Sequence, residues 1–384
     1  MSHWRARRFF LKYRFTLALV FAATAFAALL ASHATRAQAP PSDVVPKTAA
    51  QQFKNIEVLK DIPADQLIPS MQFITASLGV ECEYCHVRSA FEKDDKKPKL
   101  MARKMITMMM AINKNNFEGH REVTCYSCHR GAAEPIATPV ISAEETAPTE
   151  QPDESAKAAL PPADQLLDKY LAAVGGAAAL QKITSRVAKG TASFAGQKVA
   201  VDVYSKAPDK RLSVMHLKDG DSLTAFDGHQ GWLSVSSRTH IMSAAENAAA
   251  GIDADFYFPI DIKSRYEKFY VEQGEKIGGH ETFLVTGRKE GVPPLRLYFD
   301  TQSGLLVRLV RYAETPLGRN PTQIDYADYR ESDGIKLPFQ WTLARPGNRF
   351  TIQVEQMQQN VSVDDAKFVP PPPPPPPPQK PTGR

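Results

Sequence analysis

Hydrophobic and polar residues alternate with two different periods along this chain, and the change of period divides it into regions. Before Gly131, apolar residues recur at helical spacing. One helix is predicted from Ile68 to Leu78, ended by Gly79, and a longer one over residues 98–116. After Ser185 apolar and polar residues alternate one by one, as in strands that bury one face. The pattern therefore predicts a mainly α-helical first region and a β-rich second region.

The second region, residues 164–369, begins with a helical pattern from Leu166 to Val174, which Gly175-Gly176 ends before a shorter helix through Leu180. Alternating segments follow at residues 199–204, 295–299, 305–310 and 350–354. Turn pairs separate such segments: Asp219-Gly220, Asp227-Gly228, Gly278-Gly279, Ser303-Gly304 and Asp333-Gly334. Many strands at short spacing with few helices predict an antiparallel sheet curved into a half-barrel, in an α+β domain with helices at its start.

Three further segments have no globular pattern. Residues 1–39 combine a basic start, an apolar run of about 17 residues and small residues near Ala37, which is typical of an export signal or of a retained membrane anchor. Both interpretations place the rest of the chain outside the cytoplasm, in the periplasm. Residues 132–163 are rich in alanine, proline and acids, so they predict a flexible linker. Residues 370–384 contain nine consecutive prolines and predict a stiff tail.

The net charge changes the picture little. It is +5 for the whole chain, but residues 1–39 hold six basic residues and no acid, so the remainder carries about −1. A protein that binds nucleic acid concentrates basic residues on its binding surface. The charge distribution therefore argues against a nucleic-acid partner.

Two short motifs contain all four cysteines: Cys82-Glu-Tyr-Cys85-His86 and Cys125-Tyr-Ser-Cys128-His129. Both have the C-x-x-C-H spacing of c-type haem attachment. Two thiols three positions apart on one turn can reach both vinyl groups of a haem, and the next histidine then lies beneath the ring. The motifs predict two covalently bound haem c groups. His86 would bind the iron of the first and His129 the iron of the second.

Other chemistry uses cysteine pairs as well. A C-x-x-C pair can be a thioredoxin-type redox disulfide or half of a four-cysteine zinc site. Neither explains a histidine directly after the pair in both copies, and no strand–helix pattern of thioredoxin type surrounds them. Export also favours haem, which is attached after export.

The sixth iron ligands are sought among methionines. Met71 lies eleven residues before Cys82 on the first predicted helix, and the second helix carries Met101, Met105, Met108, Met109 and Met110. Positions 101, 105, 108 and 112 form one stripe at helical spacing. Such a stripe is commonly core packing, but beside a haem motif one ligand and several packing residues are expected.

Residues 53–131 resemble the cytochrome c subunit of photosynthetic reaction centres. The stretches that carry the resemblance are Met71-Gln-Phe-Ile, Leu78 to His86, Ala102-Arg-Lys-Met105, Ile112-Asn113, and Val123 to Gly131. The resemblance implies a helix, a turn and a C-x-x-C-H motif for each haem, with a methionine of the helix as sixth ligand. By position, Met71 would bind the first iron and Met105 the second, with Met108 and Met109 as alternatives. The family has four such modules, whereas this chain has two.

His120 resembles a histidine that, in this family, reaches a haem of the half that is missing here. The alternative interpretation is an ordinary surface histidine, and it is favoured because the chain has no third motif. His120 is therefore kept only as an alternative iron ligand.

The second region resembles the LolA-like lipoprotein carriers in residues 226–232, 297–305 and 329–338. This resemblance implies a curved sheet with helices that close a hydrophobic mouth, and with it a lipid-like ligand. The scattered histidines of this region lack metal-ligand spacing.

The preferred function is an exported dihaem electron carrier that is not an enzyme, with a redox protein or a membrane electron-transfer complex as its partner. The charged segment Glu92–Lys99 is either a solvated loop or a surface that orients this partner. Two alternatives stay open: a dihaem peroxidase, which needs one open iron site, and a haem-bearing protein that binds or senses a ligand.

Overall fold

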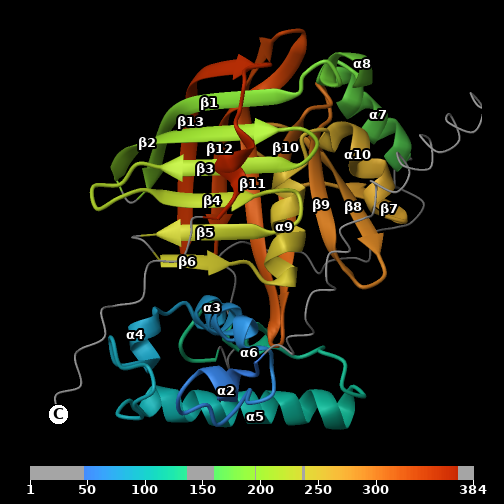
Figure 1. Cartoon of the computed structure of the whole chain (residues 1–384). Helices are drawn as coiled ribbons and strands as arrows, with labels where there is room; N and C mark the ends of the chain where they lie inside the picture. Colours follow the sequence, from blue (N-terminus) through green and yellow to red (C-terminus); the bar gives the residue numbers. More distant parts are fainter. Residues whose placement is uncertain (1–46, 136–159, 195, 236–237, 371–384) are drawn as a thin grey trace, which may run out of the picture. The chain divides into compact units, whose positions relative to one another are not determined.

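The computed structural model describes residues 47–135, 160–194, 196–235 and 238–370 (Figure 1). The predicted export signal, most of the linker and the prolines after Pro370 lie outside the described residues. Within the ranges described, no helix is both long enough and apolar enough to cross a membrane.

The first part of the chain is helical, as predicted. Its elements are α2 (Ala49–Gln52), the 3₁₀ helix η1 (Ala64–Gln66), α3 (Leu67–Leu78), α4 (Cys82–Cys85), α5 (Lys97–Asn116) and α6 (Cys125–His129). Helix α3 ends where the sequence predicts, because Gly79 takes the left-handed conformation with φ 65° that a side chain disfavours. Helix α5 has Pro98 in its first turn, where the missing N–H costs no helical hydrogen bond.

The second part is one open antiparallel sheet of 13 strands. The strands are β1 (Ser185–Phe194), β2 (Gln197–Lys206), β3 (Lys210–Met215), β4 (Ser222–Phe226), β5 (Gly231–Val235), β6 (Arg238–Ile241), β7 (Lys268–Gln273), β8 (Thr282–Lys289), β9 (Val292–Asp300), β10 (Leu306–Thr315), β11 (Gly318–Ser332), β12 (Ile335–Arg345) and β13 (Asn348–Gln359). Their order is β6-β5-β4-β3-β2-β1-β13-β12-β11-β10-β9-β8-β7. Strands consecutive in sequence are therefore neighbours, except that β6 and β7 lie at opposite edges; the pairing of β1 with β13 joins the two halves. Every predicted turn pair lies between two consecutive strands.

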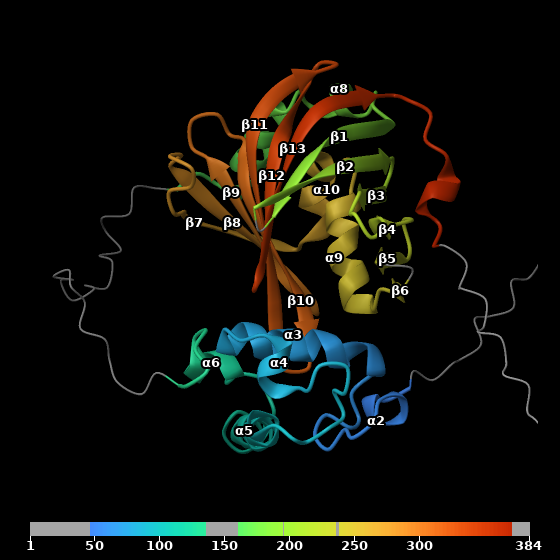
Figure 2. The same cartoon turned by 90° about the vertical axis from the view of Figure 1, so that its left-hand side faces the viewer.

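Helices α7 (Ala163–Ala173) and α8 (Ala177–Leu180) precede the sheet, as predicted. Helices α9 (Ala244–Ala254) and α10 (Phe258–Arg265) were not predicted; they follow β6 and lie on the concave side of the sheet (Figure 2). The signal for α9 was present, because Ser243 and Glu246 form a capping box at its start. Its alanine-rich sequence lacks large apolar residues at helical spacing, the pattern from which the other helices were predicted.

The sheet encloses its core between its concave face and these helices. Leu167, Tyr170 and Ile262 from the helices pack against Leu297 and Phe299 of β9. A second cluster closes the other edge, where the Trp232 indole donates a 2.7 Å hydrogen bond to the carbonyl of Phe368 in η3 (Asp365–Phe368). Both clusters bury large apolar side chains, the main source of fold stability.

The turn between β10 and β11 packs into the helical part of the chain. Leu317, at this turn, is 1% exposed and belongs to the same apolar cluster as Phe73, Ile106 and Met109. The next residue, Gly318, leaves no room for a Cβ atom because the Phe73 ring lies against it. This turn therefore supplies part of the core that supports α3 and α5.

Candidate haem sites

The first C-x-x-C-H motif forms a single helical turn, α4. The backbone N–H of His86 donates a 3.0 Å hydrogen bond to the carbonyl of Cys82, which closes the turn. The backbone of His86 is extended, so the helical turn ends there. Residues three apart on one turn project to the same side. Cys82 and Cys85 therefore present both thiols together, with His86 directly after them. All four cysteines of the chain are free thiols.

The second motif forms the corresponding turn, α6, with stronger local support. Thr124 and Ser127 form a capping box at its start, and Arg130 and Gly131 end it in the left-handed conformation. Asn113 of α5 is buried and donates a 2.7 Å hydrogen bond to the Val123 carbonyl, while its own oxygen accepts from the Val123 N–H at 2.9 Å. Asn113 thus fixes the segment that leads into Cys125.

Both motif histidines are oriented in the same way. The Nδ1 atom of His86 lies 2.9 Å from the carbonyl oxygen of Phe91, and Nδ1 of His129 lies 3.0 Å from the carbonyl oxygen of Ala132. A carbonyl only accepts hydrogen bonds, so Nδ1 carries the proton in each ring. Nε2 is then the nitrogen with a free lone pair, the atom that binds iron.

A cavity of about 650 Å³ adjoins the first motif. Its lining includes Met71 of α3, Cys82, Cys85 and His86, together with residues of α5. Cavities of this size hold organic cofactors, and the lining is predominantly apolar, as a porphyrin requires. The residues present therefore fit a haem, which Cys82, Cys85 and His86 would hold, with Met71 in the same lining.

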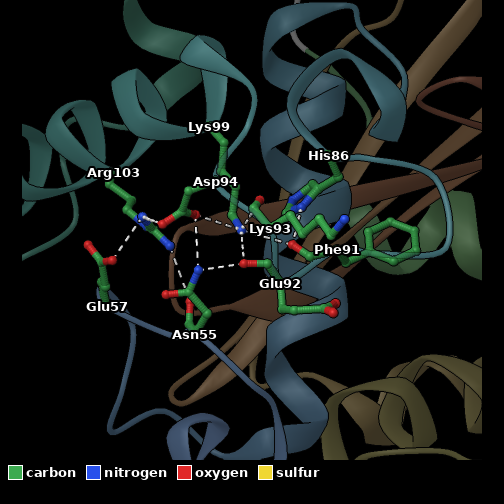
Figure 3. A network of polar contacts seen from close by, with 9 residues as sticks. All are labelled: Asn55, Glu57, His86, Phe91, Glu92, Lys93, Asp94, Lys99 and Arg103. Atoms are coloured by element: carbon green, nitrogen blue, oxygen red, sulfur yellow. Dashed lines mark hydrogen bonds and ion pairs between the residues drawn. The ribbon is translucent and has the colours of Figure 1, made fainter.

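A polar network closes one side of this cavity (Figure 3). Lys99, 7% exposed, donates hydrogen bonds to the carbonyls of Phe91, Glu92 and Lys93 at 2.9, 3.0 and 2.8 Å, and pairs with Asp94 at 3.0 Å. Lys99 thus forms hydrogen bonds and an ion pair within the charged segment Glu92–Lys99 itself. The network holds the Phe91 carbonyl that orients His86.

Arg103 connects the network to the segment between α2 and η1. Its guanidinium donates to Asp94 at 2.9 Å and to the carbonyl of Asn55 at 3.2 Å, and pairs with Glu57 at 3.0 Å. These bonds, with those from Asn55 and Lys99, hold the pKa of Asp94 well below its ordinary value. Asn55, Glu57, Lys99 and Arg103 all line the cavity; of these, only Lys99 belongs to a segment for which a role was predicted from the sequence.

In each motif one thiol lies in surroundings that raise its pKa. Burial raises the pKa of Cys85, against the opposing charge of Lys96, and burial likewise raises the pKa of Cys125. Thioredoxin-type chemistry depends on a thiol whose pKa is lowered. Cys85 and Cys125 have the opposite shift.

The methionines of α5 divide between two faces. Met109 is buried with Ile106 in the core, on the face that also turns Lys99 and Ala102 towards the first cavity. The stripe through positions 101, 105, 108 and 112 faces elsewhere, because Met101 is 54% exposed and Met108 48% exposed. Met105 is half-buried on this stripe, and the expectation that the stripe supplies one iron ligand and several packing residues stays a prediction.

His120 lies at the surface in the turn after α5. Asn113, which holds the approach to the second motif, was missed as a positioning residue. Its signal was an asparagine at a position that the helical pattern of α5 places beside Ile106 and Met109.

Comparison with known proteins identifies relatives of the first part. Residues 18–192 match the family model of the photosynthetic reaction centre cytochrome c subunit. The chain is 32% identical over 97 residues to that subunit from Thermochromatium tepidum, a match that covers 24% of each chain. It is also 32% identical over 85 residues to cytochrome c-554 from Chloroflexus aurantiacus, covering 20% of each. The matched segment thus spans about a quarter or less of these relatives, and it confirms the resemblance of the haem region to this family.

Solved structures resemble the sheet part. One is a putative outer membrane lipoprotein-sorting protein domain from Vibrio parahaemolyticus, with a TM-score of 0.36 and 10% identity over 53% of this chain and 94% of that one. Another is a LolA superfamily protein from Nitrosomonas europaea, with a TM-score of 0.36 and 12% identity over 55% of this chain and 98% of that one.

Proposed function

We propose that this chain is an exported dihaem c-type cytochrome that carries electrons in the periplasm and is not an enzyme. The observation that carries the proposal is the matching construction of the two motifs. Each presents two thiols on one turn, and each directs histidine Nε2 outward by holding Nδ1 on a backbone carbonyl. Family resemblance supports the same chemistry. A haem held in this way supplies reversible one-electron chemistry.

For the first haem, Cys82 and Cys85 form the thioether links and His86 the proximal iron bond. Met71 lines the same cavity and is proposed as the sixth ligand. A thioether ligand favours ferrous iron and raises the reduction potential, as an electron carrier requires. It also leaves no open iron position for a peroxide substrate, which disfavours the dihaem peroxidase.

For the second haem, Cys125 and Cys128 form the thioether links and His129 the proximal bond. Met105 is proposed as the sixth ligand, with Met108, Met109 and His120 as alternatives. A haem on this side would cover the exposed stripe of α5, and apolar surface of this kind is stabilised when it is covered. Met109 is the weakest alternative because it lies in the core.

We infer the following division of the chain: a haem domain over residues 48–131, a linker over 132–163 and a sheet domain over 164–369. The haem domain would exchange electrons with a redox protein or a membrane electron-transfer complex. Photosynthesis is not part of the proposal, because the relatives share only a quarter of their length with this chain. The sheet domain would bind a lipid-like ligand; its concave face holds a cavity lined largely by apolar residues, which supports that role.

The experiment is a haem count and an absorption spectrum on protein matured with the cytochrome c machinery. Two haems per chain that resist acid–acetone extraction, with the weak red ferric band of methionine–iron ligation, are expected. Met71→Ala should remove the part of this band that belongs to the first haem, and Met105→Ala the part that belongs to the second. Met110→Ala, on an exposed methionine of α5, is the matched control and should leave the spectrum unchanged.

Two outcomes would change the proposal. Covalent haem without the methionine band would point to histidine ligation or to an open, peroxidase-like site. Protein without covalent haem after maturation would contradict the central proposal.

A further inference from the structure

A group of arginines lies on the concave face of the sheet, far along the chain from the haem motifs. Arg186 of β1 and Arg211 of β3 line a cavity of about 170 Å³, roofed by Asp253 of α9. A second cavity of about 150 Å³ shares Arg186 and Asp253 with the first, so the two adjoin. The cationic side chains Arg186 and Arg211 therefore lie together at one pair of small adjoining cavities.

The charges in this space are not balanced. The only acid in the lining of the first cavity, Asp253, is already held by Arg311, which donates to it through two nitrogens at 2.8 and 2.5 Å. Within the described ranges, Arg186 and Arg211 form no ion pair, and the buried Nε of Arg186 has no hydrogen-bond partner. A buried donor without a partner is costly, and proteins rarely keep one without a reason.

The two guanidinium groups are also held in place. Arg186 stacks over the Phe256 ring, with 4.9 Å from its central carbon to the ring centre, and Arg211 over Trp341 at 5.9 Å. Burial, reinforced by the like charge of Arg211, lowers the pKa of Arg186 to about 10, which still leaves it charged at neutral pH. Both groups are thus positioned cations without an ion pair among the described residues, although the charge of Asp253 opposes the lowering of the Arg211 pKa by burial.

Apart from Ser205 and Tyr326, the remaining walls are apolar. Val203, Ile324, Leu337, Trp341 and Leu343 surround the arginines. A site that joins a cationic end to apolar walls is complementary to a molecule with one anionic end and an apolar tail. A carboxylate suits the planar guanidinium fork, and its single charge suits a cavity that already contains Asp253.

We propose that the concave face of the sheet binds an apolar monocarboxylate, whose carboxylate lies between Arg186 and Arg211 and whose tail lies along Leu337, Trp341 and Leu343. The proposal rests on the ligand-binding role suggested above for the sheet domain and names the chemistry of the ligand. It does not depend on the electron-transfer role of the haems.

The test is calorimetric titration of the full haem-loaded chain with octanoate, and with octanol as a neutral molecule of the same tail length. Octanoate is expected to bind, and octanol to bind much more weakly. Arg186→Met and Arg211→Met should each weaken octanoate binding about 30-fold or more, since each removes one partner of a buried charge pair. Arg288→Gln, on an exposed arginine, is the matched control and should bind like the unaltered chain.

A thermal unfolding measurement separates this role from a structural one. Without ligand, Arg186→Met should leave the melting temperature unchanged or raise it, because it removes an uncompensated buried charge. A lower melting temperature together with unchanged octanoate binding would overturn the proposal. Octanoate and octanol binding equally well would overturn the anion site and leave the ligand-binding role; no binding of either would overturn both.

Discussion

Lys99 and His86 share one hydrogen-bond acceptor, the carbonyl oxygen of Phe91, and each lies 2.9 Å from it (Figure 3). A buried ammonium group therefore competes with the proximal histidine for one oxygen. The strength of the His86 bond to this oxygen sets how much electron density the ring gives to a metal. In the proposed function, Lys99 would thus influence the first haem through His86.

Lys99→Met should lower the reduction potential of the first haem by tens of millivolts. Loss of a positive charge stabilises oxidised iron, and the released carbonyl binds the His86 N–H more strongly, which acts in the same direction. Redox titration of the matured protein measures this shift. Lys99→Arg keeps the charge and should change the potential less; equal shifts in both variants would contradict this account. Lys99→Met should also cost about 1–3 kcal/mol of stability, because three part-buried hydrogen bonds and the ion pair to Asp94 are lost.

Asp94→Asn should alter the acid dependence of stability. The hydrogen bonds from Arg103, Asn55 and Lys99 hold the pKa of Asp94 below its ordinary value of 3.8. A lowered pKa in the folded state stabilises the protein above the unfolded value, and this contribution is lost as the pH falls towards the lowered value. The unaltered chain should therefore be more stable than Asp94→Asn at neutral pH, and the difference should shrink below about pH 4.

Urea unfolding at a series of pH values measures the difference between Asp94→Asn and the unaltered chain. Asp95→Asn, on the exposed neighbour, is the control and should follow the unaltered chain throughout. A stability difference for Asp94→Asn that stays constant down to strongly acid pH would show that its charge is not the cause.

Gly79→Ala should destabilise the haem region more than Gly131→Ala. Both glycines have positive φ, but a Cβ atom on Gly79 would overlap the carbonyl oxygen of Gly131, whereas one on Gly131 meets nothing within 4 Å. The backbone cost alone predicts about 1–2 kcal/mol for Gly131→Ala. The added overlap predicts about 2–5 kcal/mol for Gly79→Ala. Chemical unfolding of both variants compares them directly, and equal losses would mean that the Gly79–Gly131 contact is easily displaced.

Leu317→Ala should destabilise the helical part, although Leu317 belongs to the turn between two strands. Its side chain is 1% exposed in the cluster that contains Phe73, Ile106 and Met109. Truncation of a buried leucine costs about 2–5 kcal/mol. Val292→Ala, on an exposed residue at the start of β9, is the control and should cost no more than about 0.5 kcal/mol. Protease susceptibility of the α5 region reports the effect, and unchanged protection in Leu317→Ala would contradict it.

The role of Gly79 at the end of α3 was predicted from the sequence, but its close contact with Gly131 was not. Gly79 was expected to end a helix, because its local sequence requires a left-handed residue there. The hydrogen bond from the Gly131 N–H to the Ser77 carbonyl at 2.9 Å joins the end of the second motif to the end of α3. No periodic pattern in the chain encodes that contact.

The sequence by itself determined the features whose cause lies within a few residues. These are the two C-x-x-C-H turns, the helices predicted over 68–78 and 98–116, the glycine that ends the first of them, and the turn pairs between strands. Each depends on short-range geometry: three residues bring two thiols to one side, and a positive φ needs a glycine.

Only the tertiary structure decided which distant residues meet. It placed Lys99 on the carbonyl that orients His86, buried Leu317 beneath α3, and brought Arg186 and Arg211 together over a concave face covered by α9. Sheet order and helix packing join segments that lie tens to hundreds of residues apart, so a local pattern carries no record of them. The burial that strengthens the electrostatic interactions of Lys99, Arg186 and Arg211 exists only once the chain has folded.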